Sequence, residues 1–179
     1  LAKSWTVSPD GLTYTFQLEP NARWHDGKPL TAEDVVYTAR EFLPVTHPRA
    51  RDIFGRCESI TAAGAHTVVF KLKAPFGPFL SAFDISNLPV MPKHIYAGTD
   101  LAKNPANLNP IGSGPYKLKE WVRGSHIHLV RNDDYFKPGL PHLDAIIYRV
   151  MPDGASRALA IEKSTVQLTQ WTDLELLDD

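Results

Sequence analysis

The stretch WHDGKPLTAEDV at residues 24–35 carries the strongest local signals in this chain. A strand is predicted to end at Trp24, and Asp26-Gly27 supplies residues that tolerate the positive φ angles of a tight turn. Thr31 is placed to cap a helix, and Asp34 follows three residues later as a short-armed member of a capping box. These rules predict a strand, a turn and the start of a helix, and they indicate no chemistry.

Hydrophobic periodicity predicts further strands and helices around this stretch. Residues 13–18 alternate, with Tyr14, Phe16 and Leu18 on one face, as in a half-buried strand. The other predicted strands are residues 67–72 in a hairpin with Ile60, then 116–121, 126–131, 145–151 and 166–169. The predicted helices are residues 32–43, which Pro44 ends, and the shorter 79–83, 92–96 and 155–162. This mixture predicts an α/β fold of mixed sheets with flanking helices.

Composition narrows the class of protein. The chain has 179 residues, of which 43% are hydrophobic and 22% charged, and these are values of an ordinary globular protein. A formal net charge of −1 gives no electrostatic reason to expect nucleic acid or an anionic membrane as a partner. No apolar run approaches the ~20 residues of a membrane span. Cys57 is the only cysteine, which excludes an intramolecular disulfide and a cysteine-based metal site.

The 24–35 stretch is very similar to the signature of the family 5 extracellular solute-binding proteins, the dipeptide, oligopeptide and nickel receptors of bacterial ABC importers. Four further segments resemble motifs of this family in the family's order, namely residues 1–16, 112–118 (GSGPYKL), 130–136 (VRNDDYF) and 151–158. One segment departs from the pattern, since KSTVQ stands at residues 163–167 where the family usually shows Gly-Glu-Val-Asp.

The resemblance implies a fragment of a two-lobed periplasmic-binding-protein-like fold. Residues 1–110 would be the accessory region beside the first lobe, residues 111–179 part of that lobe, and the second lobe would be absent. It also implies a binding protein and no enzyme, without a cofactor, located in the periplasm or outside the cell. Its partners would be a peptide or other small solute and the importer's permease. No signal peptide or initiator Met is present, so we expect sequence to be missing upstream. A surface left uncovered by the missing lobe would favour self-association.

The resemblance places residues 83–89 near the cleft between the lobes. Asp84, Ser86 and Asn87 are small polar residues in an apolar context there, as in the walls of ligand pockets. We therefore take these three as candidate ligand-binding residues. An ordinary polar loop explains the same pattern, and the sequence leaves both readings open.

Single features of the sequence suggest two other kinds of site. Ser113 between two glycines could be the nucleophile of a small hydrolase, but neither the phosphate-loop nor the nucleophile-elbow spacing is present, and a tight turn explains the segment better. His126 and His128 have a spacing that suits a metal-binding module. We expect them to face solvent, with Ile127 and Leu129 in the core.

Two smaller expectations concern single residues. For His25 we expect a local hydrogen bond in its turn, beside Asp26. Aromatic residues on and around the first strand are expected to be core residues and not a stacking platform for sugars or bases, namely Trp5, Tyr14, Phe16 and Trp24.

Overall fold

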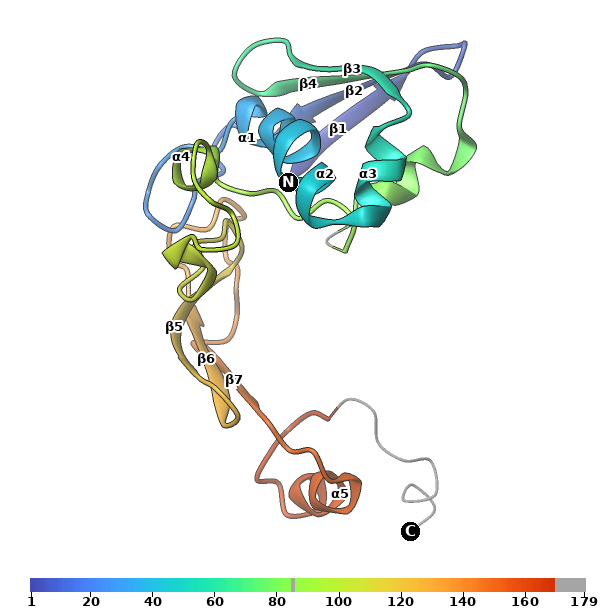
Figure 1. The fold of residues 1–179 in the computed structure, drawn as a ribbon. Helices are drawn as coiled ribbons and strands as arrows, with labels where there is room; N and C mark the ends of the chain where they lie inside the picture. Colours follow the sequence, from blue (N-terminus) through green and yellow to red (C-terminus); the bar gives the residue numbers. More distant parts are fainter. Residues whose placement is uncertain (85, 170–179) are drawn as a thin grey trace.

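A computed structural model describes residues 1–84 and 86–169 and shows two antiparallel sheets joined by loops (Figure 1). The first sheet has the strand order β1-β2-β4-β3 and the second has the order β5-β6-β7. The strands are β1 (Ala2–Val7), β2 (Thr13–Leu18), β3 (Cys57–Ala62), β4 (Thr67–Leu72), β5 (Tyr116–Val122), β6 (His126–Arg131) and β7 (Ala145–Arg149). The α/β class of sheets with flanking helices is confirmed, and every pairing between the described strands is antiparallel.

Some of the helices cover one face of the first sheet, and the remaining helices lie along the connecting loops (Figure 1). The α-helices are α1 (Ala32–Tyr37), α2 (Leu43–Thr46), α3 (Pro48–Phe54), α4 (Lys93–Tyr96) and α5 (Gly154–Glu162). Two 3-10 helices, η2 (Gly77–Ala82) and η3 (Pro105–Asn107), and a π-helical segment, η1 (Thr38–Phe42), complete the set in the described residues.

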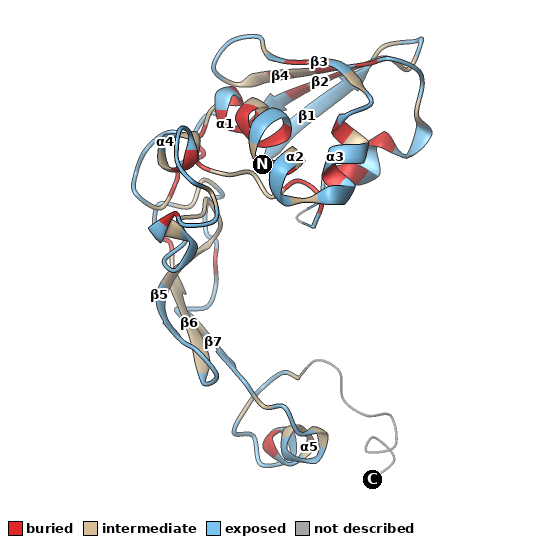
Figure 2. Cartoon of the chain, viewed as in Figure 1, coloured by how far each residue is buried: buried red, intermediate tan, exposed pale blue. Residues whose placement is uncertain are grey.

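The hydrophobic core lies between the first sheet and its helices, where Figure 2 shows the buried residues gathered. The alternation predicted for β2 is confirmed, because Tyr14, Phe16 and Leu18 are all buried. Across the sheet Phe16 pairs with Val68 and Tyr14 with Phe70, so β4 presents the same face to the core. Trp24 is also buried, at 2% exposure. The prediction for Trp5 is wrong: it is 55% exposed on β1, an edge strand whose six residues are all exposed.

The helix predicted for residues 32–43 forms, but Pro44 does not end it. The backbone winds into the π-helical segment η1, in which the Leu43 N–H donates to the carbonyl of Thr38, five residues back. Pro44 then occupies the first turn of α2, where a missing N–H is tolerated. In a regular α-helix the Pro44 ring would clash with a backbone carbonyl of the preceding turn. The wider π turn avoids this clash.

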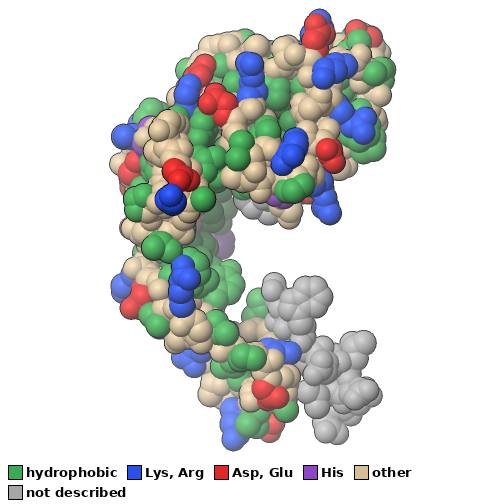
Figure 3. All heavy atoms as spheres, viewed as in Figure 1, with side chains coloured by type: hydrophobic (Ala, Val, Ile, Leu, Met, Phe, Trp, Pro, Cys, Tyr) green, Lys and Arg blue, Asp and Glu red, His purple; other side chains and the backbone are tan. Residues whose placement is uncertain are grey.

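In the part of the chain that the structure describes, no residue of the three strands of the second sheet is buried. Cross-strand pairing aligns Leu118 with Leu129 and Ile146, and Trp121 with Ile127 and Tyr148, which gives one apolar face. Each of these six side chains is only half-buried or exposed. Figure 3 shows hydrophobic side chains exposed among charged ones in the region of the second sheet. On β6 the sequence predicts that the two histidines face solvent and that Ile127 and Leu129 lie in the core. This prediction is wrong, because His126, Ile127, His128 and Leu129 are all half-buried.

Near the end of the described residues the predictions have mixed outcomes. The helix expected at residues 155–162 is α5, which begins after Asp153, whose Oδ2 accepts the Ser156 N–H at 2.7 Å. The strand expected at residues 166–169 does not form. Instead the chain leaves α5 through Ser164, at φ 54°, and the amides of Thr165 and Val166 bond back to the carbonyl of Ala160.

Candidate functional site

The buried carboxylate of Asp34 organises the start of α1. Its Oδ2 accepts the Thr31 N–H at 2.9 Å, as the capping box predicts, and its Oδ1 accepts the Lys93 N–H at 2.9 Å. Asp34 is only 5% exposed. One side chain therefore caps the start of α1 and also binds the first residue of α4, which lies far along the chain.

Asp26 makes a second link between the turn and α4. Its Oδ2 lies 2.7 Å from His94 Nε2, and its Oδ1 accepts the Lys28 N–H at 3.1 Å inside the turn. Burial works to raise the pKa of Asp26, but the hydrogen bonds from His94 and Lys28 outweigh it and lower that pKa. Gly27, at φ 86°, provides the positive φ that the turn requires.

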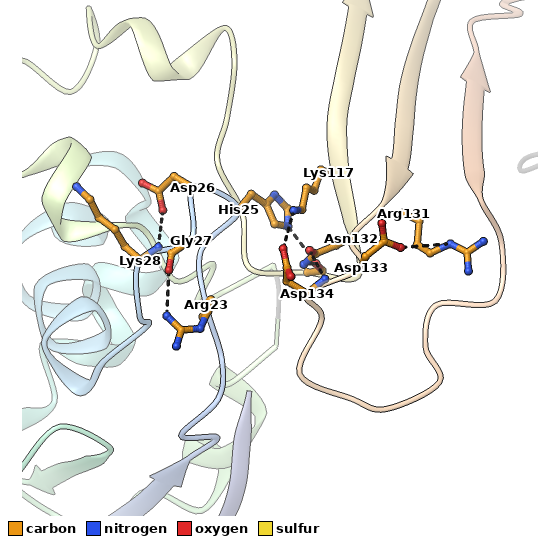
Figure 4. A network of polar contacts seen from close by, with 11 residues as sticks. Arg23, His25, Asp26, Gly27, Lys28, Lys117, Arg131, Asn132, Asp133 and Asp134 are labelled. Atoms are coloured by element: carbon orange, nitrogen blue, oxygen red, sulfur yellow. Dashed lines mark hydrogen bonds and ion pairs between the residues drawn. The ribbon is translucent and has the colours of Figure 1, made fainter.

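His25 points the other way, toward the loop before β5 (Figure 4). The Gly112 N–H donates to His25 Nδ1 at 3.2 Å, and His25 Nε2 lies 3.0 Å from the Gly114 carbonyl oxygen. The backbone N–H of His25 also donates to the Gly112 carbonyl at 2.8 Å. The local hydrogen bond expected for His25 within its turn is wrong, because both ring nitrogens contact a loop 87 and 89 residues further along the chain.

The carbonyl oxygen of Gly114 is shared by two side chains. Asn132, which is 4% exposed, donates from Nδ2 to this oxygen at 3.0 Å, and its backbone N–H donates to the Pro115 carbonyl at 2.9 Å. The WHDG turn, the GSGP loop and the RNDDY turn therefore meet at one acceptor. We call this set, His25, Gly112, Gly114 and Asn132, the motif junction.

Close packing at the motif junction explains why residue 112 is glycine. A Cβ built on Gly112 would lie 3.2 Å from His25 Cε1, closer than most real Cβ contacts. A Cβ on Gly114 would meet nothing within 4 Å. Only the first of the two glycines is thus required by its neighbour.

The three candidate ligand-binding residues lie together in the loop after η2. The Asp84 carboxylate accepts the backbone N–H groups of Ser86 and Asn87 at 2.8 Å each, and the Asn87 side-chain amide at 2.9 Å. Asn87 is buried, and its Oδ1 has no hydrogen-bond partner among the described residues. Ser86 is exposed. Asp84 and Asn87 therefore order the loop, and Ser86 offers its hydroxyl to solvent.

The two alternative sites gain no support from the geometry. Both ring nitrogens of His25 contact the backbone on either side of Ser113, so this ring has no nitrogen left to act as its base. His126 lies 3.3 Å from Glu120 and 3.0 Å from Ser125 Oγ. Within residues 1–84 and 86–169, no three His, Cys, Asp or Glu side chains are grouped as metal ligands.

An open depression of about 450 Å³ lies at the far end of the second sheet. Its lining includes Ser125, His126, Ile147, Arg149 and Val150. None of the candidate ligand-binding residues contributes to it. In the same described residues, the helices are all too short or too polar to cross a membrane.

Comparison with known proteins shows that this chain is similar to solute-binding proteins. The family model for bacterial extracellular solute-binding proteins, family 5, matches residues 1–179. The oligopeptide-binding protein AppA of Bacillus subtilis is 39% identical over 165 residues, which cover 89% of this chain and 30% of AppA. The structure of AppA in complex with a nonapeptide matches with a TM-score of 0.79 at 34% identity, covering 93% of this chain and 34% of AppA.

Two other solved structures carry different ligands. NikZ from Campylobacter jejuni, in complex with Ni(L-His), matches with a TM-score of 0.79 at 27% identity over 93% of this chain and 33% of NikZ. AgaA from A. tumefaciens, in complex with agropinic acid, matches with a TM-score of 0.80 at 33% identity over the same shares. The chain spans about a third of the length of the relatives it matches.

Proposed function

The chain belongs to family 5 of the bacterial extracellular solute-binding proteins, and from this membership we propose that it acts in the substrate-binding component of a bacterial ABC importer. The match of the family model along residues 1–179 is the observation that carries the proposal. The protein would work in the periplasm or outside the cell and deliver its solute to a membrane permease. It would bind without catalysis.

We propose a division of the chain that separates its two sheets. Residues 1–110 would form the accessory region beside the first lobe, and residues 111–179 part of that lobe. Support comes from the motif junction, which fastens the 24–30 turn to the loop that enters β5. A solute would be held between this body and an opposite lobe, since such receptors enclose their ligands from two sides.

Peptides are the solute class we propose. AppA is named an oligopeptide-binding protein and has a nonapeptide in its structure, and it is more similar in sequence to this chain than NikZ is. Within the chain, the loop of Asp84, Ser86 and Asn87 is the proposed contact region. The exposed Ser86 hydroxyl would meet the solute, while Asp84 and the buried Asn87 hold the loop in shape.

Binding to the product of the whole encoding gene tests the proposal. The protein would be dialysed against a mixture of dipeptides to nonapeptides, nickel with histidine, and agropinic acid, and the retained solutes identified by mass spectrometry. Retained peptides would support the proposal. Retention of a non-peptide solute alone would overturn the peptide assignment, and labelling of Ser113 by a fluorophosphonate would overturn the binding function.

Self-association is proposed only for this chain in isolation. Trp121, Ile147 and Tyr148 are between 43% and 56% exposed on the second sheet, and removing such apolar area from water favours contact between copies. Sedimentation of the 179-residue chain over a range of concentrations would show a rising mass if this is right, and a constant monomer mass if it is wrong.

A further inference from the structure

We infer that His25 is a proton-sensitive latch, whose ring binds both Gly112 and Gly114 of the 112–114 loop only while it is neutral. This role is separate from solute binding. It depends on the position of the ring between a donor and an acceptor of the same loop.

The geometry fixes the tautomer of the ring. A backbone N–H can only donate, so Gly112 at 3.2 Å requires an unprotonated Nδ1. The proton of the neutral ring must then be on Nε2, which donates it to the Gly114 carbonyl at 3.0 Å. Neutral His25 satisfies both partners at once.

A second proton on the ring would break this arrangement. Protonated Nδ1 becomes a donor and faces the donor N–H of Gly112, so one hydrogen bond is replaced by a repulsive contact. The ring cannot turn aside without losing Gly114 too, since its Nε2 is held there. The Gly112 N–H and Nδ1 are in direct contact at 3.2 Å, so the two donors would face each other directly.

The surroundings of His25 also favour the neutral form. Burial lowers the pKa of His25, and the positive charge of Lys117 lowers it further, against the opposing hydrogen bond to Gly114 and the charge of Asp26. Lys117 in turn lies 3.5 Å from Asp134, and Asp26 is paired with His94. The charged and titratable groups around the ring, from the turn, α4, β5 and the loop after β6, are Asp26, His94, Lys117 and Asp134.

The sign of the pH dependence follows from the lowered pKa. The folded chain binds the proton less readily than the unfolded chain, so the stabilisation by His25 is complete above the unfolded value near 6.5. It is lost as the pH falls below that value and through the folded pKa. Other contacts remain at acidic pH, because Ile111 and Phe136 pack against the core of the first sheet. Acid therefore loosens the motif junction without separating its two sides.

Nuclear magnetic resonance on the 179-residue chain tests the latch. At pH 7.5 the ring ¹⁵N shifts of His25 should show a protonated Nε2 and a bare Nδ1. On lowering the pH from 7.5 until the ring ¹⁵N shifts report the second proton, the hydrogen-exchange protection factor of the Gly112 amide should fall about tenfold, as expected for the loss of one partly buried hydrogen bond. A proton on Nδ1 at pH 7.5, or a protection factor that does not change, would overturn the inference.

Two variants separate the latch from general acid effects. His25→Asn keeps an acceptor for the Gly112 N–H and has no titrating ring, so its Gly112 protection should be independent of pH over this range. His142→Asn removes an exposed histidine outside the motif junction and should retain the wild-type fall. A wild-type fall in His25→Asn would contradict the latch. If that variant does not fold, the ring shifts of the wild-type chain still decide the question.

Discussion

His25 and Asn132 donate to the same acceptor: His25 Nε2 and Asn132 Nδ2 each lie 3.0 Å from the carbonyl oxygen of Gly114. One residue comes from the turn after β2 and the other from the turn after β6. Gly114, in the loop between them, binds both. Segments that resemble the family signature are thus joined by direct contacts, and these contacts explain the residue types of His25, Gly112 and Asn132.

Gly112→Ala should destabilise the chain, because its Cβ would press on the His25 ring, which two hydrogen bonds hold in place. We expect a loss of about 1–2 kcal/mol, typical of overpacking at a fixed neighbour. The measurement is the free energy of unfolding from urea titration at pH 7.5.

Gly114→Ala is the matched control for this substitution. Its Cβ meets nothing within 4 Å, so we expect no loss and a gain of up to about 0.5 kcal/mol from the restricted unfolded chain. Equal effects of the two substitutions would show that packing against His25 is not what requires glycine at residue 112.

Asp34→Ala should remove acceptors for the backbone N–H groups of Thr31 and Lys93 and leave them poorly satisfied. We expect a loss of about 2–3 kcal/mol in the free energy of unfolding. Its neighbour Glu33 is the control, because its ion pair with Lys93 at 2.9 Å is exposed. Glu33→Ala should change stability by less than about 1 kcal/mol. The explanation fails if Glu33→Ala costs as much as Asp34→Ala.

Cys57 should react slowly with thiol reagents in the folded chain. Burial raises the pKa of its thiol to about 11, and the nearby positive charge of Lys73 only partly opposes this effect. At pH 8 the thiolate fraction is therefore very small, and thiolate is the reactive form. Iodoacetamide labelling, followed by mass spectrometry, should be at least about tenfold faster in guanidinium chloride than in buffer. Equal rates would mean that the thiol is not protected by the fold.

For the candidate ligand-binding loop we predict one effect on solute binding and a separate effect on stability. Ser86→Ala should weaken solute binding by the product of the whole gene and leave its stability unchanged, because the hydroxyl is exposed. Asp84→Ala should lower stability by about 1 kcal/mol, since the backbone N–H groups of Ser86 and Asn87 lose their acceptor. Calorimetric titration and thermal unfolding measure the two effects. Unchanged affinity in Ser86→Ala would remove the loop from the binding site.

Local rules predicted the elements whose signals lie within a few residues. The alternation of Tyr14, Phe16 and Leu18 reflects a strand with one buried face, and the spacing of Thr31 and Asp34 reflects a helix start. Pro44 was misjudged because a π turn allows a proline where a regular helix would not. The missed helix α3 had a local signal in Pro48, which occupies its first turn after His47.

The motif junction could not be predicted in the same way. His25 and Gly112 are far apart in sequence, and no periodicity connects them. A turn histidine beside an aspartate suggests a local hydrogen bond, and the structure pairs that aspartate with His94 instead. The strand β1 was missed for a related reason: all six residues are exposed, so its sequence lacks the pattern that burial imposes.

A double-mutant cycle between His25 and Asn132 tests most directly whether the motifs act as one junction. His25→Ala, Asn132→Ala and the double variant would be compared with the wild-type chain by urea unfolding at pH 7.5. Because both side chains donate to the Gly114 carbonyl, we expect a coupling energy of about 1 kcal/mol. Single effects that add to within about 0.3 kcal/mol would contradict a shared junction.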